Sequence, residues 1–133
     1  MKRNIFGAVV TAIVLLAVSM PVLAHHSFTA AFDPEKPITV KGVLTKVRLE
    51  NPHSWFFLEV KDASGKVETW AFEAGTPSGM IRNGYKPDII KAGTEVTVKG
   101  LRARDASQTM GMLQQLVTAD GKVYGLFGPQ EAK

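Results

Sequence analysis

Residues 38–49 read ITVKGVLTKVRL, an alternation of apolar and polar side chains that changes phase partway along. Alternate residues of an extended strand face opposite sides. One face carries Ile38, Val40 and Leu44, and the other carries Val43, Val47 and Leu49. The phase changes beside Gly42, and such a change at a glycine predicts a β-bulge. The bulge would bend one long strand so that it serves two sides of a barrel.

Shorter alternating segments follow this long strand, separated by turn residues. We expect strands over residues 54–61, 66–74, 94–103, 110–118 and 123–127. Residues 62–65 and 119–122 have the composition of tight turns. Thr76 and Pro77 predict the start of a short helix, as cap and first-turn residue, which Gly84 would end.

The order of these elements predicts the fold class. The elements follow the order of the OB-fold, a small Greek-key barrel. This order is a long bent strand, a hairpin, a short helix between the third and fourth strands, and two more strands. The alternative all-β architecture is an open sandwich. The phase change in the long strand and the position of the helix favour the barrel, an all-β domain of five to six strands.

The first 24 residues are typical of an export signal. Lys2 and Arg3 precede an apolar run over residues 5–18, and Val22 and Ala24 are the small residues that a signal peptidase reads. A membrane anchor is the alternative, but the run is short against the roughly 20 residues that span a bilayer. We therefore expect residues 1–24 to be cleaved and the protein to work in the periplasm or outside the cell, no longer attached to the membrane.

Cleavage would leave residues 25–37 as an N-terminal arm, 38–127 as the barrel and 128–133 as a tail. The chain has no cysteine, which excludes a disulfide and a lipid anchor on cysteine. Its net charge is +4, and two of the positive residues, Lys2 and Arg3, belong to the predicted signal. The remaining charge is too small for extensive phosphate neutralisation, so nucleic acid is not an expected partner.

Three histidines are candidate metal ligands: His25, His26 and His53. A processed terminus at His25 would offer its α-amine and ring nitrogen together. His53 could complete the arrangement known as a histidine brace, with His26 as a helper. Amine and imidazole nitrogens suit copper first, and zinc or nickel less selectively. The alternatives are that His53 only bonds a backbone carbonyl in its turn and that the two terminal histidines form a disordered arm.

Methionine offers a second copper hypothesis. Met110 and Met112 lie two residues apart, on one face of a strand, and thioethers select Cu(I). The small periplasmic copper chaperones of cation-efflux systems are similar in class, since their OB-folds hold Cu(I) between a histidine, paired methionines and a tryptophan. Here His53 and Trp55 precede the methionines by more than fifty residues, which departs from that pattern. The alternative, which we favour, is that both methionines fill the barrel interior.

Trp55 and Phe57 share a strand face with Glu59 and Lys61, which predicts partial exposure. Aromatic residues on the second and third strands of such a barrel form a usual ligand face. They predict a docking surface for a peptide, a sugar or a periplasmic protein partner. The alternative is that the N-terminal arm or the final strand covers them.

The sequence contains no catalytic motif. Ser54 directly follows His53, and neighbours in a strand point to opposite faces, so they do not form a nucleophile and base pair. Five carboxylates along the strands and turns are scattered as solvated charges usually are: Glu50, Glu59, Asp62, Glu68 and Glu73. We therefore expect a binding protein rather than an enzyme.

Several short motifs together resemble an uncharacterised bacterial family of small exported proteins, known as a domain of unknown function. They are His25-His26-Ser27-Phe28, Phe32-Asp33, Val40-Lys41-Gly42, Asn51-Pro52-His53-Ser54, Trp70-Ala71-Phe72-Glu73 and Gly93-Thr94-Glu95-Val96-Thr97-Val98. The resemblance implies a signal peptide and an OB-like barrel, and no activity. The paired histidines and the Asn-Pro-His turn belong to the family pattern and the methionines do not, which favours His25, His26 and His53 as the metal ligands.

Overall fold

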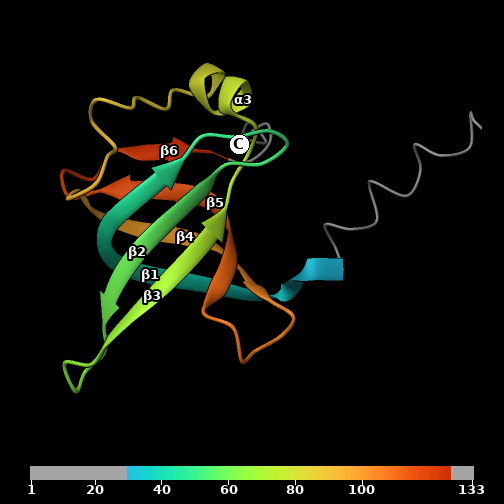
Figure 1. Cartoon of the computed structure of the whole chain (residues 1–133), viewed down its shortest axis with the longest axis vertical. Coiled ribbons are helices and arrows are strands. Elements are labelled where there is room, and N and C mark those ends of the chain that lie inside the picture. The colour runs from blue at the N-terminus through green and yellow to red at the C-terminus, as the bar shows by residue number, and fades with distance from the viewer. Residues whose placement is uncertain (1–29, 127–133) are drawn as a thin grey trace, which may run out of the picture. The chain divides into compact units, whose positions relative to one another are not determined.

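The computed structural model describes residues 30–126. The predicted signal peptide, His25, His26 and the predicted tail lie outside the described residues. Six strands and a short helix make up the domain (Figure 1): β1 (Phe32–Arg48), β2 (Trp55–Lys61), β3 (Val67–Glu73), α3 (Pro77–Arg82), β4 (Glu95–Ala103), β5 (Met110–Thr118) and β6 (Val123–Gly125). Within residues 30–126, no helix is long and apolar enough to cross a membrane.

The strands close into a barrel. The sheet order is β3-β2-β1-β4-β5-β6, and a further pairing joins β3 to β5. This pairing is parallel, whereas the other neighbours are antiparallel. The circuit β1-β2-β3-β5-β4 and back to β1 is that of the OB-fold, so the predicted fold class is confirmed and the open sandwich is excluded.

A single apolar cluster fills the barrel. All six strands contribute inward-facing residues, and the largest fully buried side chains include Phe56, Phe72, Leu58, Leu113 and Leu116. Fully burying one such side chain is worth about 1.5–3 kcal/mol. This core replaces the disulfides that a chain without cysteine cannot form.

The bend in β1 lies later than predicted. The register between β1 and β2 shifts between Leu44 and Lys46, not beside Gly42. Val43 is therefore 40% exposed, whereas Val47 packs against the core. Gly42 serves another purpose, because a Cβ there would lie 2.5 Å from the carbonyl oxygen of Glu59. The glycine lets β2 approach the bent strand closely.

The strand predicted from Ile38 also begins earlier, at Phe32. Phe32 pairs with Ala103 and Pro37 pairs with Leu101, so the register of β1 on β4 shifts between these two points. Apolar alternation is absent from residues 33–37, which is why the sequence pattern did not reveal this part of the strand.

Helix α3 lies across one end of the barrel (Figure 1). The Thr76 side chain accepts a hydrogen bond from the Gly79 amide at 3.1 Å, and Pro77 occupies the first turn, both as predicted. Gly84 follows the helix with a φ of 92°, a left-handed conformation that glycine adopts without strain. The buried side chain of Met80 joins the core and fastens the helix to the barrel.

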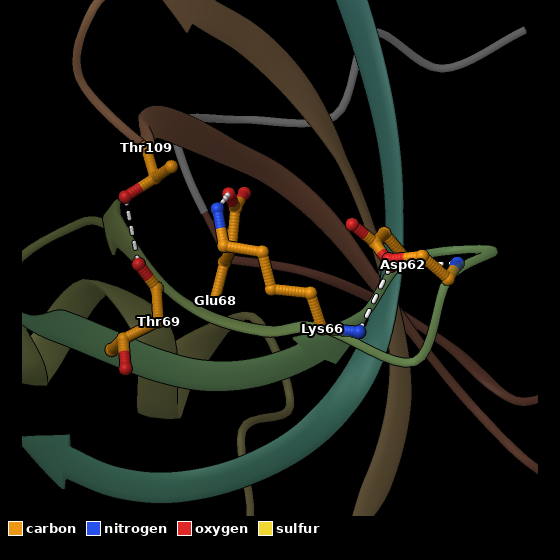
Figure 2. Close-up of polar contacts among 6 residues, drawn as sticks. Asp62, Lys66, Glu68, Thr69 and Thr109 are labelled. Carbon is orange, nitrogen blue, oxygen red and sulfur yellow. Dashed lines mark hydrogen bonds and ion pairs between the residues drawn. The ribbon is translucent and has the colours of Figure 1, made fainter.

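The turn between β2 and β3 is built around Asp62 (Figure 2). Its carboxylate accepts hydrogen bonds from the amides of Ser64 and Lys66, at 2.8 and 3.0 Å. The hydroxyl of Ser64 also donates to it, and this bond, with the backbone bonds, lowers the pKa of the Asp62 carboxyl. The turn sets the pairing of β2 on β3 without a register shift.

Thr109 fastens β5 to β3 where the barrel closes. Its hydroxyl donates to the carbonyl of Thr69 at 2.7 Å (Figure 2), and its own carbonyl accepts from the Ala71 amide at 3.0 Å. Next along β5, Gly111 pairs with Phe72. A Cβ on Gly111 would lie 2.8 Å from the Leu101 carbonyl oxygen and 3.0 Å from Cε1 of Phe72. A side chain there would push β5 away from β4 and displace the Phe72 ring.

We predict that Gly111→Ala destabilises the domain by about 1–3 kcal/mol, the usual cost of an added methyl group in a packed interior. Urea unfolding followed by tryptophan fluorescence measures this loss. Gln114→Ala, at an exposed position of the same strand, is the control and should change stability much less. Equal stability of the two variants would show that the closure tolerates a side chain at position 111.

Candidate functional site

A row of three side chains crosses the outer face of the barrel. Trp55 of β2 pairs with Glu73 of β3, and Glu73 pairs in turn with Met112 of β5. Their chain neighbours Phe56, Phe72 and Leu113 point into the core, so the three row members point outward. Neighbouring strands lie about 4.8 Å apart, which places the three side chains next to one another. We call them the outer row.

A second, apolar row runs beside it. Phe57 pairs with Ala71, and Ala71 pairs with Met110. Trp55, Phe57 and Met110 are half-buried, whereas Met112 is only 5% exposed. The alternation of β5 places both methionines on the face opposite to Leu113, which belongs to the interior core cluster. Met112 is nevertheless buried there.

His53 contacts Glu73, the middle member of the outer row. It follows the cis Asn51–Pro52 peptide bond in the loop between β1 and β2, and its Nδ1 contacts Oε1 of Glu73. The imidazole is 39% exposed and the carboxylate only 15%. Glu73 is therefore not one of the scattered solvated charges that we expected, and His53 bonds a carboxylate rather than only a backbone carbonyl.

The contact determines which nitrogen of the His53 ring carries the proton. An ionised carboxylate only accepts hydrogen bonds, so Nδ1 is the donor. In a neutral imidazole the lone pair then belongs to Nε2, the atom that would bind a metal. Histidine ligands of metals usually donate their second ring N–H to a carboxylate or a carbonyl in this way. Glu73 thus orients the His53 ring as the carboxylate partner of a metal-binding histidine would.

Within residues 30–126, no group of three histidine, cysteine or acidic side chains is positioned to hold a metal ion. A centre at His53 needs further donors. The thioethers of the outer face are one source, and the predicted terminus with His25 and His26, outside the described residues, is another.

Ser54 lies on the opposite side of the strand from its neighbour. It is fully buried, and its hydroxyl oxygen has no hydrogen-bond partner. Its amide donates to the Gly75 carbonyl at 3.0 Å, which fixes the loop backbone next to His53.

A hollow of about 410 Å³ lies elsewhere, beside Gly42 of β1. Its charged side chains are of both signs, and two of them, Lys41 and Glu95, already form an ion pair of 2.9 Å. It contains no histidine or methionine, so its chemistry does not connect it to the outer face. Its lining is Lys41, Gly42, Val43, Glu59, Lys61, Val67 and Glu95.

Sequence reasoning missed Glu73, although a signal was present. Counting back from the turn at residues 62–65 places Glu73 opposite Trp55, and hence diagonal to His53. The neighbourhood of Met112 had no such local signal, because it depends on the parallel pairing of strands that are distant in the sequence.

Comparison with known proteins gives a family and no activity. The model of a family described as "Family of unknown function (DUF6152)" matches residues 12–113. The matched stretch contains His53 and the whole outer row. No curated protein matches the chain.

We predict that the neutral ring of His53 carries its proton on Nδ1. The imidazole ¹⁵N chemical shifts distinguish the two tautomers, and Glu73→Gln should reduce the preference, because an amide also offers a donor group to the ring. Glu68→Gln, which alters an exposed carboxylate of the same strand, should leave the tautomer unchanged. A ring protonated mainly on Nε2 in the unaltered protein would contradict the orientation that we assign to Glu73.

Proposed function

The chain belongs to DUF6152, a family of unknown function, and we propose that it is an exported binding protein for a transition metal, copper first. The proposed centre combines Nε2 of His53 with the α-amine and ring of His25 at a processed terminus, with His26 as a helper. The observation that carries the proposal is the contact between His53 and Glu73 on the outer face of the barrel.

The strand pairing supports the proposal, because it gives the distance that the segment before β1 must cross to reach His53. The strand begins at Phe32, beside Ala103 of β4. From β1 the path over β4 and β5 to β3 crosses three strand spacings, about 14 Å. The chain from His25 to Phe32 advances by seven residues, of which residues 30 and 31 are helical, so it spans up to roughly 20 Å. A terminus created at His25 therefore has enough length to bring its amine to His53.

The donor set favours copper. An α-amine and two imidazoles are nitrogen donors, and the affinity of such sites for divalent metals is highest for copper in the Irving–Williams order. A carboxylate behind one imidazole raises the basicity of that ligand and restricts its orientation. The centre is proposed for binding, and no catalytic step is assigned to it.

The competing function is a metal-free module that binds a peptide or a partner protein. It is favoured by the half-buried aromatic residues Trp55 and Phe57, which share the outer face with Ala71 and Met110. Apolar residues of this kind on β2 and β3 suit the usual ligand face of the fold. This function does not require His53.

We predict that His53→Ala lowers the affinity for Cu(II) by at least about a hundredfold, since the anchoring imidazole is lost. Glu73→Gln should lower it about 10–100-fold, because the carboxylate that orients the imidazole is lost. Competition with a chromophoric chelator measures both, on protein exported and cleaved by its own signal. Glu59→Gln, an exposed carboxylate on the outward side of β2, is the matched control and should have no effect. An unchanged Cu(II) affinity in His53→Ala would favour the metal-free module.

We also predict that the α-amine is a ligand. A version with an initiator methionine retained ahead of His25 should bind Cu(II) much more weakly than the processed protein, because the amine and the ring then no longer belong to one residue. Mass spectrometry of the exported protein establishes where the mature chain begins. Equal affinity of the two versions would exclude coordination through the amine, whatever the contribution of His53.

A further inference from the structure

We propose that Met112 supplies a thioether to a metal ion bound at Nε2 of His53, so that this ion can be Cu(I) as well as Cu(II). This inference rests on the proposed function. It differs from the methionine hypothesis drawn from the sequence, in which both methionines act together, because the register assigns the ligand to one of them.

The register places Met112 beside the partner of His53. Glu73 and Met112 are directly paired on neighbouring parallel strands, and Nδ1 of His53 contacts the Glu73 carboxylate. The ring is therefore drawn toward β3, over the same outer face. The backbones of β2 and β5 are two strand spacings apart, about 9.6 Å. A histidine and a long unbranched methionine side chain can meet over this distance.

The surroundings of Met112 suit a soft ion. Met112 is 5% exposed, yet it is not a member of the interior core cluster. Phe32 and Ala103, which pair with each other on β1 and β4, are likewise buried without belonging to that cluster. Met112 is thus shielded from solvent although it lies apart from the interior core cluster. Thioether ligands select Cu(I) over hard cations, and an apolar shell limits the access of solvent to the ion.

Met110 lies in a different position. It pairs with Ala71 rather than with Glu73, two residues earlier on β5, about 6.6 Å along the strand. Its neighbours across β3 and β2 are Ala71 and Phe57, neither of which has a metal-binding group. Met110 is therefore the matched control for Met112, on the same strand and the same face.

The test compares Met112→Leu with Met110→Leu. Leucine conserves the volume and usually costs less than about 1.5 kcal/mol of stability. Cu(I) affinity is measured without oxygen by competition with a chromophoric Cu(I) chelator, and Cu(II) affinity is measured on the same proteins. We expect Met112→Leu to lower the Cu(I) affinity about tenfold or more while Cu(II) affinity stays nearly unchanged, and Met110→Leu to alter neither.

Equal Cu(I) losses in the two variants, or none in Met112→Leu, would overturn the inference. If Cu(II) binding still depended on His53, the proposed function would stand without it. A second measurement needs no variant. With methionine methyl groups labelled in the unaltered protein, Cu(I) should shift the ¹³C signal of Met112 and leave those of Met110 and Met80 in place. A shift at Met110 instead of Met112 would equally contradict the assignment.

Discussion

The parallel pairing of β3 with β5 is the constraint on which the outer face depends. In the open sheet order, β3 and β5 are separated by β2, β1 and β4. Closure makes them neighbours, and Met112 then lies next to Glu73. Between the two methionines lies Gly111, where a Cβ would meet the carbonyl oxygen of Leu101 in β4 and the Phe72 ring of β3. The glycine therefore lets β5 pack closely between its two neighbours.

The contact between His53 and Glu73 orients the imidazole on this outer face. A carboxylate that is only 15% exposed on an otherwise apolar face loses much of its hydration, which a hydrogen bond from the ring partly replaces. The same bond keeps the proton on Nδ1 and the lone pair of a neutral ring on Nε2. On β5, Met112 pairs with Glu73. The proposed centre thus combines an oriented imidazole with a soft sulfur donor, a combination suited to copper in both oxidation states.

Local patterns predicted most of the fold. Alternation located the strands to within a few residues, apart from the first six residues of β1, and Thr76 and Pro77 located the helix. The position of the bulge was wrong because the glycine at position 42 was taken as the bulge itself. In the structure it permits close approach of Glu59, and the register shifts between Leu44 and Lys46. A glycine in a strand is compatible with either role.

The site was less predictable than the fold because some of its residues are brought together by local pairing and others by the pairing of strands far apart in the sequence. Glu73 could have been found by counting across one hairpin, since that register is set locally. Whether Met112 pointed inward, and which residue it adjoined, depended on the nonlocal pairing of two distant strands. His25 and His26 enter through the expected processing of the chain, and only the length of the arm connects them to the described barrel.

The most direct test of the account is to locate the ion in the processed protein. One equivalent of Cu(II) broadens the NMR signals of nearby nuclei. The amide signals of His53, Trp55, Glu73 and Met112 should disappear. Those of residues 62–65 should remain, because this turn lies seven residues along β2 from Trp55, about 23 Å away. Broadening that left the outer row intact and appeared elsewhere in the barrel would contradict the proposed centre.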